Sequence, residues 1–465
     1  MLQTRLWESL HCPSARQLNG FGKFLQSPYF NQRRDLVDLY QSLKRAIDRE
    51  KALSRVELWQ STFPEKEYVE QDLRLLMTYL QRLLEQFIAV EQTLEDKVGI
   101  KLQTAAWYRS KGMDKLHKTA LNKGVLYLEK APLRNAEYFY QQFQFELEKY
   151  KIASHTKPDA TVDFQKVIEQ LDIAFLSMKL RQSCELMIHD RIYNWGFDSG
   201  FIDQIFTYLE EQKLIAIPAI GIYYYCYRML ETPEEEKWFQ SFKKELLERG
   251  QYFDQEEIHN LYILAINYCV RRANDGFRHY FVDIMDFYRK GLDREYLLQN
   301  GVLSRFTYHN IVSAALKIDQ SDWAESFIGE WMPRLEKRYR ERMFSFNRAK
   351  IAYHRKDYDA AIPLLQRANY HDLLLNLGAR TLLLKIYHEL NEFELLQSHL
   401  DAFSSYLRRK SGLGYHRKNY RNLIHFTNRL LSLNLTDRHA IEQFKGEVLK
   451  TEILTEREWL LARLN

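Results

Sequence analysis

The pattern of apolar and polar positions along the chain is helical over most of its length. After Asp254, for example, apolar residues recur at spacings of three and four: Ile258, Leu261, Ala265 and Cys269. Residues at these spacings share one face of a helix, whereas a half-buried strand alternates apolar and polar residues. The pattern predicts about sixteen to eighteen helices and no strand.

Helix start signals recur along the chain. Each places Ser, Thr or Asp before a helix and Glu three residues later, so that the first side chain caps a free backbone N–H and the acid favours the positive helix end. The five pairs are Ser54 with Glu57, Thr232 with Glu235, Asp254 with Glu257, Asp322 with Glu325, and Thr455 with Glu458. In the second pair, Pro233 is expected at the first helical position.

The composition agrees with this interpretation. Only 17 Gly and 9 Pro occur in 465 residues, which is about half the usual share and leaves few turn residues for a fold of many short strands. Tyr (30) and Phe (27) are abundant, as expected where large flat side chains fill the space between helices. The expected fold class is therefore all-α.

Three short segments in the last third of the chain repeat at a fixed interval. DQSDWAESF, HRKDYDAAI and ELNEFELLQ place Trp323, Tyr358 and Phe393 at intervals of 35 residues. An acidic residue directly precedes each aromatic residue. An interval of this length is typical of arrays of helical pairs.

The middle unit shows the fullest pattern. Small, aromatic, small, large and small residues follow one another in the order expected where two helices approach closely: Ala349, Tyr358, Ala361, Leu365 and Ala368. This order resembles the tetratricopeptide (TPR) repeat, in which one helix ends just before the aromatic residue and the next begins just after it. The match covers residues 342–375, and the flanking units match in part. The resemblance implies a TPR-like α-solenoid of antiparallel helix pairs.

The position of Pro363 tests this alignment of residues 342–375 with the TPR repeat. If Asp357 or Asp359 caps the second helix, Pro363 lies in the second turn at the latest, where it costs about one hydrogen bond. We therefore expect the chain to turn near Lys356 to Tyr358, with a second helix beginning by Ala360.

Four segments are expected along the chain. They are an N-terminal helical domain (1–95), irregular helical pairs of the solenoid (96–300), TPR-like repeats (301–435) and C-terminal capping helices (436–465). The polar stretch SHTKPDAT, Ser154 to Thr161, is the expected internal hinge.

The first hundred residues resemble two groups of proteins. FLQSPYFN resembles the start of a group of long all-helical Bacteroidota proteins, which implies no function. The turn at Pro64 and the long helix after it are similar to the helical core of winged-helix regulators. DNA binding is disfavoured, because residues 69–91 hold only Arg74 and Arg82 against four acids. We expect a packed helical domain and leave a winged-helix ancestry open.

Positive charge is concentrated in the last third of the chain. The formal net charge is +5, while residues 1–95 hold 13 basic and 13 acidic residues. Residues 334–356 hold nine basic residues and two acids, and residues 406–422 hold six basic residues and no acid. An anionic partner is therefore expected to bind in this region.

The TPR resemblance points to one candidate partner site. In TPR-like arrays the first helix of each pair lines the concave surface, and the 35-residue register gives Lys350 and Lys385 the same place on that helix. Asn347 and Tyr353 lie on nearby turns. Two cations about one repeat apart suit a peptide carboxylate or an acidic segment. The alternative is a solvated basic face.

The second basic cluster is a candidate anion or nucleic-acid patch. Its cations are Arg408, Arg409, Lys410, Arg417, Lys418 and Arg421, interleaved with Tyr406, Tyr415 and Tyr420. Base stacking together with phosphate pairing would bind RNA. Cations at a helix C-terminus are also favourable without a ligand, which is the alternative for the first three.

Signatures of catalysis and of metal binding are missing from the sequence. It contains no nucleotide-binding glycine motif, no G-x-S-x-G and no H-E-x-x-H. The 14 His and 4 Cys do not pair at ligand spacing. We expect no catalytic residue, no metal and no cofactor, and the scattered cysteines favour a reducing cytoplasm.

One uncharged run raises the question of a membrane element. Residues 214–227 carry no charge, but Pro218 and Gly221 interrupt the run, which is shorter than the about 20 residues that a bilayer requires. We expect a buried helix and no membrane contact.

The expected function is non-catalytic: a helical-repeat scaffold that binds a protein or peptide partner, with an acidic partner favoured by the charge. The alternative is a nucleic-acid-binding regulator that uses the N-terminal helical domain or the C-terminal basic surface.

Overall fold

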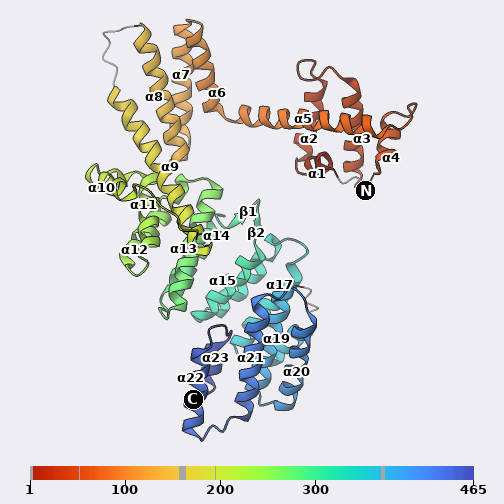
Figure 1. Cartoon of the computed structure of the whole chain (residues 1–465), viewed down its shortest axis with the longest axis vertical. Helices are drawn as coiled ribbons and strands as arrows, with labels where there is room; N and C mark the ends of the chain where they lie inside the picture. Colours follow the sequence, from red (N-terminus) through yellow and green to blue (C-terminus); the bar gives the residue numbers. More distant parts are fainter. Residues whose placement is uncertain (1–3, 52, 157–163, 194, 368–371, 465) are drawn as a thin grey trace. The chain divides into compact units, whose positions relative to one another are not determined.

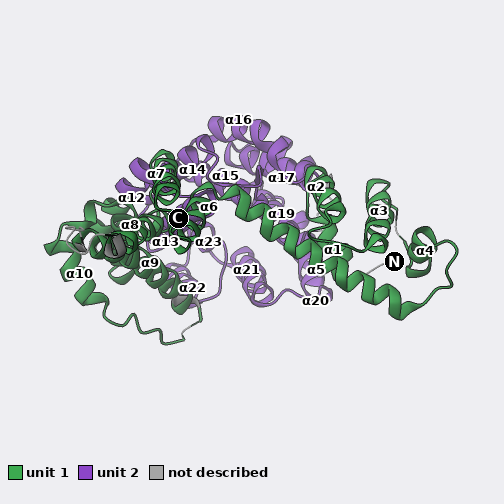
Figure 2. Ribbon diagram, turned by 90° about the horizontal axis from the view of Figure 1, so that it is seen from above, with its two compact units in different colours: residues 1–242 green, residues 243–465 purple. Residues whose placement is uncertain are grey.

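The computed structural model describes residues 4–51, 53–156, 164–193, 195–367 and 372–464 (Figure 1). The chain divides into two compact units, residues 1–242 and 243–465 (Figure 2). Nearly all regular structure in the described residues is helical, which confirms the all-α class. In these ranges, none of the helices is long and apolar enough to cross a bilayer.

The first unit is built from helices throughout its described residues. The helices are α1 (Arg5–His11), α2 (Ala15–Gln26), α3 (Arg34–Asp48), α4 (Arg55–Thr62), α5 (Glu70–Glu95), α6 (Lys97–Ser110), α7 (Asp114–Lys130), α8 (Ala136–Thr156), α9 (Phe164–Tyr193), α10 (Ile202–Glu211), the 3-10 helix η1 (Leu214–Ala216) and α11 (Pro218–Glu231). Helix α12 (Glu236–Arg249) spans the division between the units.

The structure of this first unit bears on two expectations, the packed helical domain of residues 1–95 and the buried helix of residues 214–227. Helices α1 to α5 share one apolar cluster that runs from Leu6 to Phe87, and the described part of residues 4–95 contains no strand that would form a wing. The uncharged run forms a buried helix as predicted, because Pro218 begins α11 and most α11 side chains are buried.

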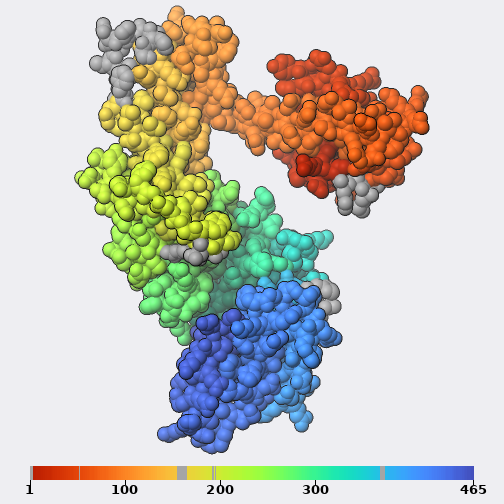
Figure 3. Space-filling view, viewed as in Figure 1, coloured from red at the N-terminus to blue at the C-terminus, as the bar shows by residue number. Residues whose placement is uncertain are grey.

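The second unit continues as a series of helices with one small hairpin. Its elements are η2 (Gly250–Tyr252), α13 (Gln255–Asn274), α14 (Tyr280–Asp293), β1 (Leu298–Gln299), β2 (Val302–Leu303), α15 (Arg305–Lys317), α16 (Ser321–Trp331), η3 (Met332–Arg334), α17 (Arg340–His354), α18 (Tyr358–Arg367), α19 (Leu373–Glu389), α20 (Phe393–Arg409), α21 (Tyr415–Ser432), α22 (Arg438–Lys450) and α23 (Arg457–Ala462). In the space-filling view, the last residues of the chain lie against the preceding helices of this unit (Figure 3).

The expectation of no strand was wrong for β1 and β2, which pair antiparallel. Asn300 and Gly301 form the two-residue turn between them, with φ of 51° and 76°. Asn-Gly is a preferred pair for such a turn, because both residues tolerate the left-handed region. The hairpin is set by this dipeptide rather than by an alternating apolar pattern.

Three successive helix pairs in the second unit, α15–α16, α17–α18 and α19–α20, share one turn geometry. A left-handed residue follows the first helix of each pair: Asp319 (φ 57°), Lys356 (59°) and Asn391 (60°). The next backbone N–H bonds back over 2.9 Å to the carbonyl five residues earlier, in Gln320 to Ala315, Asp357 to Ala352 and Glu392 to Tyr387. This hydrogen bond defines a Schellman turn, so the three pairs begin their second helices in the same way.

The prediction drawn from Pro363 is confirmed. Helix α17 ends at His354 and α18 begins at Tyr358. The Asp357 carboxylate accepts a hydrogen bond from the Ala360 N–H at 3.1 Å, as a cap does, and Pro363 follows in the second turn. Ala368 of the repeat pattern and most of the expected hinge, 157–161, lie outside the described residues.

Two of the five predicted caps are confirmed. Ser54 and Asp254 accept hydrogen bonds from the backbone N–H groups of Glu57 and Glu257. The Ser54 pair forms the full reciprocal capping box.

The other three cap predictions were wrong. Thr232 precedes a turn, and α12 begins only at Glu236. Asp322 lies inside α16, because the Schellman turn at Asp319 already starts that helix at Ser321. Thr455 does not cap α23, since left-handed Glu456 directly precedes this helix. In the last two cases the preceding left-handed residue decides where the helix begins.

Candidate functional site

Helices α15, α17 and α19 line a pocket of about 340 Å³ in the second unit. Its apolar walls come from Phe306, Met343, Phe346, Leu374, Leu375 and Leu382. Its polar lining comes from Arg305, His309, Asn310, Lys350, Asp372, Thr381, Tyr420 and Glu456. The volume and the mixed lining are typical of pockets that hold one small ligand or one large side chain.

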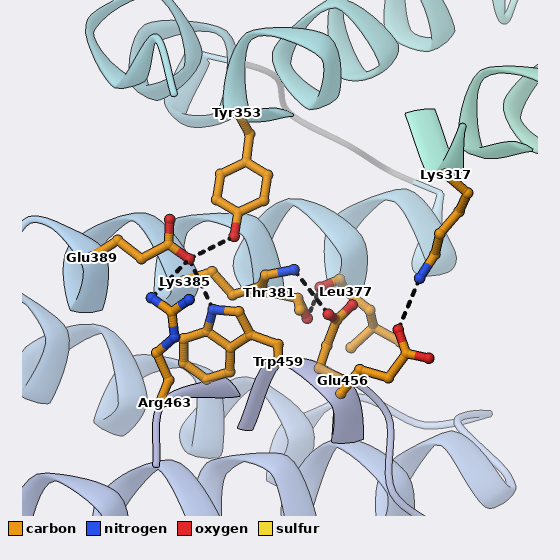
Figure 4. Close-up of polar contacts among 10 residues, drawn as sticks. Lys317, Tyr353, Leu377, Thr381, Lys385, Glu389, Glu456, Trp459 and Arg463 are labelled. Atoms are coloured by element: carbon orange, nitrogen blue, oxygen red, sulfur yellow. Dashed lines mark hydrogen bonds and ion pairs between the residues drawn. The ribbon is translucent and has the colours of Figure 1, made fainter. Parts of the chain in front are cut away.

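Lys385 of α19, one of the predicted partner residues, is paired within the chain (Figure 4). Its Nζ lies 2.9 Å from Oε2 of Glu456, and its side chain is 12% exposed. Lys317 at the end of α15 is paired in a similar way, because its Nζ lies 3.0 Å from Oε2 of Glu458. The segment that carries these two carboxylates therefore neutralises two cations contributed by α15 and α19.

Lys350 of α17 has a different environment. Its Nζ donates a hydrogen bond to the Ser313 hydroxyl at 2.5 Å, and within the described residues no carboxylate forms an ion pair with it. Burial lowers the pKa of the Lys350 ammonium to about 8, against the opposing field of Glu456 and together with the fields of Lys385 and Lys317. Lys350 therefore supplies the pocket with a cation that forms no ion pair with a carboxylate among the described residues.

Tyr353 belongs to a cluster around the carboxylate of Glu389 (Figure 4). The Tyr353 hydroxyl donates to Glu389 at 2.8 Å, and the Tyr358 hydroxyl donates at 2.6 Å. The indole N–H of Trp459 donates at 2.9 Å, and the Arg463 guanidinium lies at 3.6 Å. Burial alone would raise the pKa of Glu389, but these donors hold it below its usual range. The cluster ties α23 to α17, α18 and α19.

Asn347 is fully buried and does not reach the surface. Its amide nitrogen donates to the Met343 carbonyl at 2.8 Å. Its amide oxygen lies 2.9 Å from Nδ1 of His309 on α15. Asn347 therefore connects α15 and α17 and orients the imidazole that lines the pocket.

One end of the pocket is closed by an internal ion pair. The Arg305 guanidinium lies 2.5 Å from the Asp372 carboxylate. The other Asp372 oxygen accepts hydrogen bonds from the N–H groups of Leu374 and Leu375 and so caps α19. These contacts use both charges, so the Arg305 guanidinium is already paired within the chain, whereas Lys350 is not paired with a carboxylate among the described residues.

The four predicted partner residues thus divide into different roles. All of them lie on α17 and α19 of the second unit, but Asn347, Tyr353 and Lys385 have internal partners and Lys350 alone lines the pocket. Sequence reasoning missed His309. No motif marks this histidine, because its place in the pocket depends on the packing of α15 against α17.

The predicted anion patch lies at the end of α20 and in the first half of α21. Arg408, Arg409, Lys410, Lys418 and Arg421 are exposed. Arg409 and Arg417 bond to backbone carbonyls and Arg408 to the Ser405 hydroxyl. In the described part of the chain, none of the six cations forms an ion pair with a carboxylate.

The described residues contain no cluster of three His, Cys, Asp or Glu side chains that could hold a metal ion. The pocket instead combines a cation, an imidazole and aromatic walls, which are groups that bind and orient a ligand. In comparisons with protein-family models, curated proteins and solved structures, nothing matches the chain.

Proposed function

We propose that the chain is a non-catalytic, TPR-like helical-repeat scaffold of the cytoplasm that holds a protein or peptide partner on α15, α17 and α19. The repeat architecture is supported by the spacing of these Schellman turns, because the left-handed residues Asp319, Lys356 and Asn391 recur at intervals of 37 and 35 residues. The turn type alone is less specific, since α3, α6 and α13 end in the same way. The pocket lies on the first helices of these pairs, where the TPR resemblance places the partner.

The observation that carries this proposal is the combination of apolar walls with Lys350. Phe306 and Phe346 offer apolar surface that a partner side chain can cover, and each Å² covered contributes about 25 cal/mol. The Lys350 ammonium is desolvated but has no carboxylate partner in the described residues. A partner carboxylate would supply the missing charge, since a charge-assisted hydrogen bond contributes about 1.5–3 kcal/mol.

The test begins with affinity capture from the native host and continues with the purified partner. Titration calorimetry compares the full chain with Lys350→Gln, which removes the charge and keeps a polar side chain beside Ser313. We expect the variant to bind about tenfold more weakly. Lys337→Glu is the control, because Lys337 is exposed and lies outside the pocket. Equal affinity of Lys350→Gln and the unaltered chain would remove the pocket from the proposal.

The neutral variant is preferable to charge reversal at both predicted lysines. Lys385→Glu would place a carboxylate beside Glu456, and the resulting repulsion would disturb the folded chain as well as the site. A loss of binding in that double variant would therefore not separate the two causes.

The second candidate function is nucleic-acid binding by the basic patch at Arg408–Arg421. It is favoured by the exposure of five cations that no carboxylate among the described residues neutralises. The test is the salt dependence of binding to single-stranded RNA. We expect log K to fall with log salt at a slope of about −0.7 per phosphate contact. Absence of binding at low salt would eliminate this candidate.

A further inference from the structure

The hydrogen-bonding role of each atom in the Asn347–His309 pair follows from its neighbours. The Met343 carbonyl only accepts hydrogen bonds, so the Asn347 atom 2.8 Å from it is the donating amide nitrogen. The Asn347 amide oxygen therefore faces His309. Because this oxygen only accepts, Nδ1 of His309 carries the proton that bridges the two side chains.

His309 is neutral and keeps a free lone pair. Burial, with a smaller contribution from the charge of Lys350, lowers the pKa of the His309 imidazole to about 3. A neutral imidazole protonated at Nδ1 has an unprotonated Nε2, which accepts hydrogen bonds. Nε2 has no partner among the described residues, and His309 lines the pocket. The pocket thus offers Nε2 of His309 as a hydrogen-bond acceptor.

Lys350 offers the complementary donor and a single positive charge. Two other lysines, Lys317 and Lys385, act on Lys350 from helices α15 and α19. Lys317 forms an ion pair with Glu458, and Lys385 forms one with Glu456. Lys350 uses one of its three donors on the Ser313 hydroxyl. A ligand with several negative charges would meet only this one cation without a carboxylate partner among the described residues that line the pocket, so one negative charge fits best.

The aromatic wall of the pocket is held by close packing. A Cβ added at Gly378 of α19 would lie 2.8 Å from the Phe346 ring, closer than side-chain atoms approach one another. Gly378 therefore leaves room for Phe346 where this ring lines the pocket. The Phe346 ring forms an apolar surface together with Phe306 and Leu382. This surface lies in the same pocket as His309 and Lys350.

We infer that the pocket binds an apolar monocarboxylate that also carries one N–H or O–H donor. The carboxylate pairs with Lys350, the donor bonds to Nε2 of His309, and the apolar body covers Phe306 and Phe346. A single N-acylated aromatic amino acid has this chemistry and suits a pocket of about 340 Å³. The ligand is either a free small acid or one residue of a partner polypeptide, and the second source rests on the proposed function.

The test uses three matched probes with the full-length chain, and titration by NMR or calorimetry measures their affinities. N-acetyl-L-phenylalanine has the carboxylate and the N–H, N-acetyl-L-phenylalaninamide lacks the charge, and N-acetyl-N-methyl-L-phenylalanine lacks the N–H. We expect the first probe to bind about tenfold more tightly than either of the others. Equal affinities for the three probes, or no binding of the first, would overturn the inference.

Two variants test which residue causes each preference among the probes. Lys350→Gln should lose the preference for the acid over the amide and keep the preference for N–H over N-methyl. His309→Leu should show the opposite pattern. If circular dichroism shows that His309→Leu is unfolded, the probe series with Lys350→Gln and with the unaltered chain still tests the inferred ligand chemistry. Unchanged preferences in folded variants would contradict the assignment.

Two further measurements distinguish a free small acid from a partner polypeptide as the source of the ligand. Mass spectrometry of the denatured native-host protein detects a co-purified small acid, while capture and titration detect a polypeptide partner. Binding of the probes with a small acid and no polypeptide supports the pocket chemistry and overturns the proposed function. Binding of a polypeptide without discrimination among the probes overturns the pocket chemistry and leaves the proposed function standing.

Discussion

The indole N–H of Trp459 donates a hydrogen bond of 2.9 Å to the carboxylate of Glu389, and this bond joins the last helix of the chain to α19. Trp459 and Leu460 also lie in the apolar cluster of α19 to α23. The same carboxylate binds the hydroxyls of Tyr353 and Tyr358. One partly buried acid therefore organises the contacts of four helices.

Trp459→Phe should loosen α23 without removing its aromatic packing. The substitution leaves the Glu389 carboxylate with one donor fewer, which costs about 1–2 kcal/mol for a partly buried group. Hydrogen exchange of residues 457–462 should become about five- to thirtyfold faster. Trp107→Phe is the control, because Trp107 is 53% exposed. Unchanged exchange in α23 would show that the hydrogen bond does not hold the helix.

The stability of α23 should fall in acid through Glu389. The donors around this carboxylate lower its pKa in the folded chain, so its contribution is fully present above the unfolded pKa of about 4.3 and is lost as the pH falls through the lower folded value. Tryptophan fluorescence between about pH 5 and 2 should show this loss. Glu389→Gln should be less stable at neutral pH and less sensitive to acid. Equal acid sensitivity of the two chains would contradict the assignment.

The ion pair of Lys385 with Glu456 should give a measurable coupling energy. Both side chains are partly shielded, at 12% and 32% exposure, so removal of one partner leaves the other charge poorly solvated. In a double-mutant cycle of Lys385→Met and Glu456→Gln, thermal unfolding should yield a coupling of about 1–2 kcal/mol. Additive effects of the two substitutions would mean that the pair contributes no specific stability.

Lys350 should react with amine reagents at lower pH than an ordinary exposed lysine. Burial lowers its pKa to about 8, and the charged groups that act on it are Glu456, Lys385 and Lys317. Its acylation rate should level off above about pH 9, because the amine is then fully deprotonated. Peptide mass spectrometry measures the rate, with Lys337 as an exposed reference in the same sample. A rate at Lys350 that rises in parallel with that at Lys337 up to about pH 10 would contradict the shifted pKa.

The left-handed residue at Lys356 should tolerate glycine better than a branched residue. Lys356 has φ of 59° in the turn between α17 and α18, a conformation that costs a side-chain-bearing residue about 1 kcal/mol. Lys356→Gly should therefore raise the midpoint of thermal unfolding or leave it unchanged, and Lys356→Val should lower it. A lower midpoint for the glycine variant would show that the Lys356 side chain contributes more than the backbone strain costs.

Local sequence signals predicted elements whose cause is also local. Pro363 and Asp357 marked the start of α18 correctly because a cap and a proline act on their own helix turn. The hairpin at Asn300 and Gly301 was missed although its signal is equally local, since two-residue strands are too short to show an alternating pattern. The cap expected at Asp322 failed because the left-handed Asp319 starts the helix earlier.

By itself, the sequence determined that the chain is all-α, because apolar periodicity and turn residues act over short distances. Only the tertiary structure decided which of the two predicted lysines, Lys350 and Lys385, lines the pocket. The register gave Lys350 and Lys385 equal places, but Glu456, 71 residues beyond Lys385, pairs with Lys385 and not with Lys350. Packing of α15 on α17 likewise brings His309 against Asn347 and, through burial, lowers the pKa of its imidazole. Contacts between residues so far apart in the chain leave no local pattern from which they are predicted.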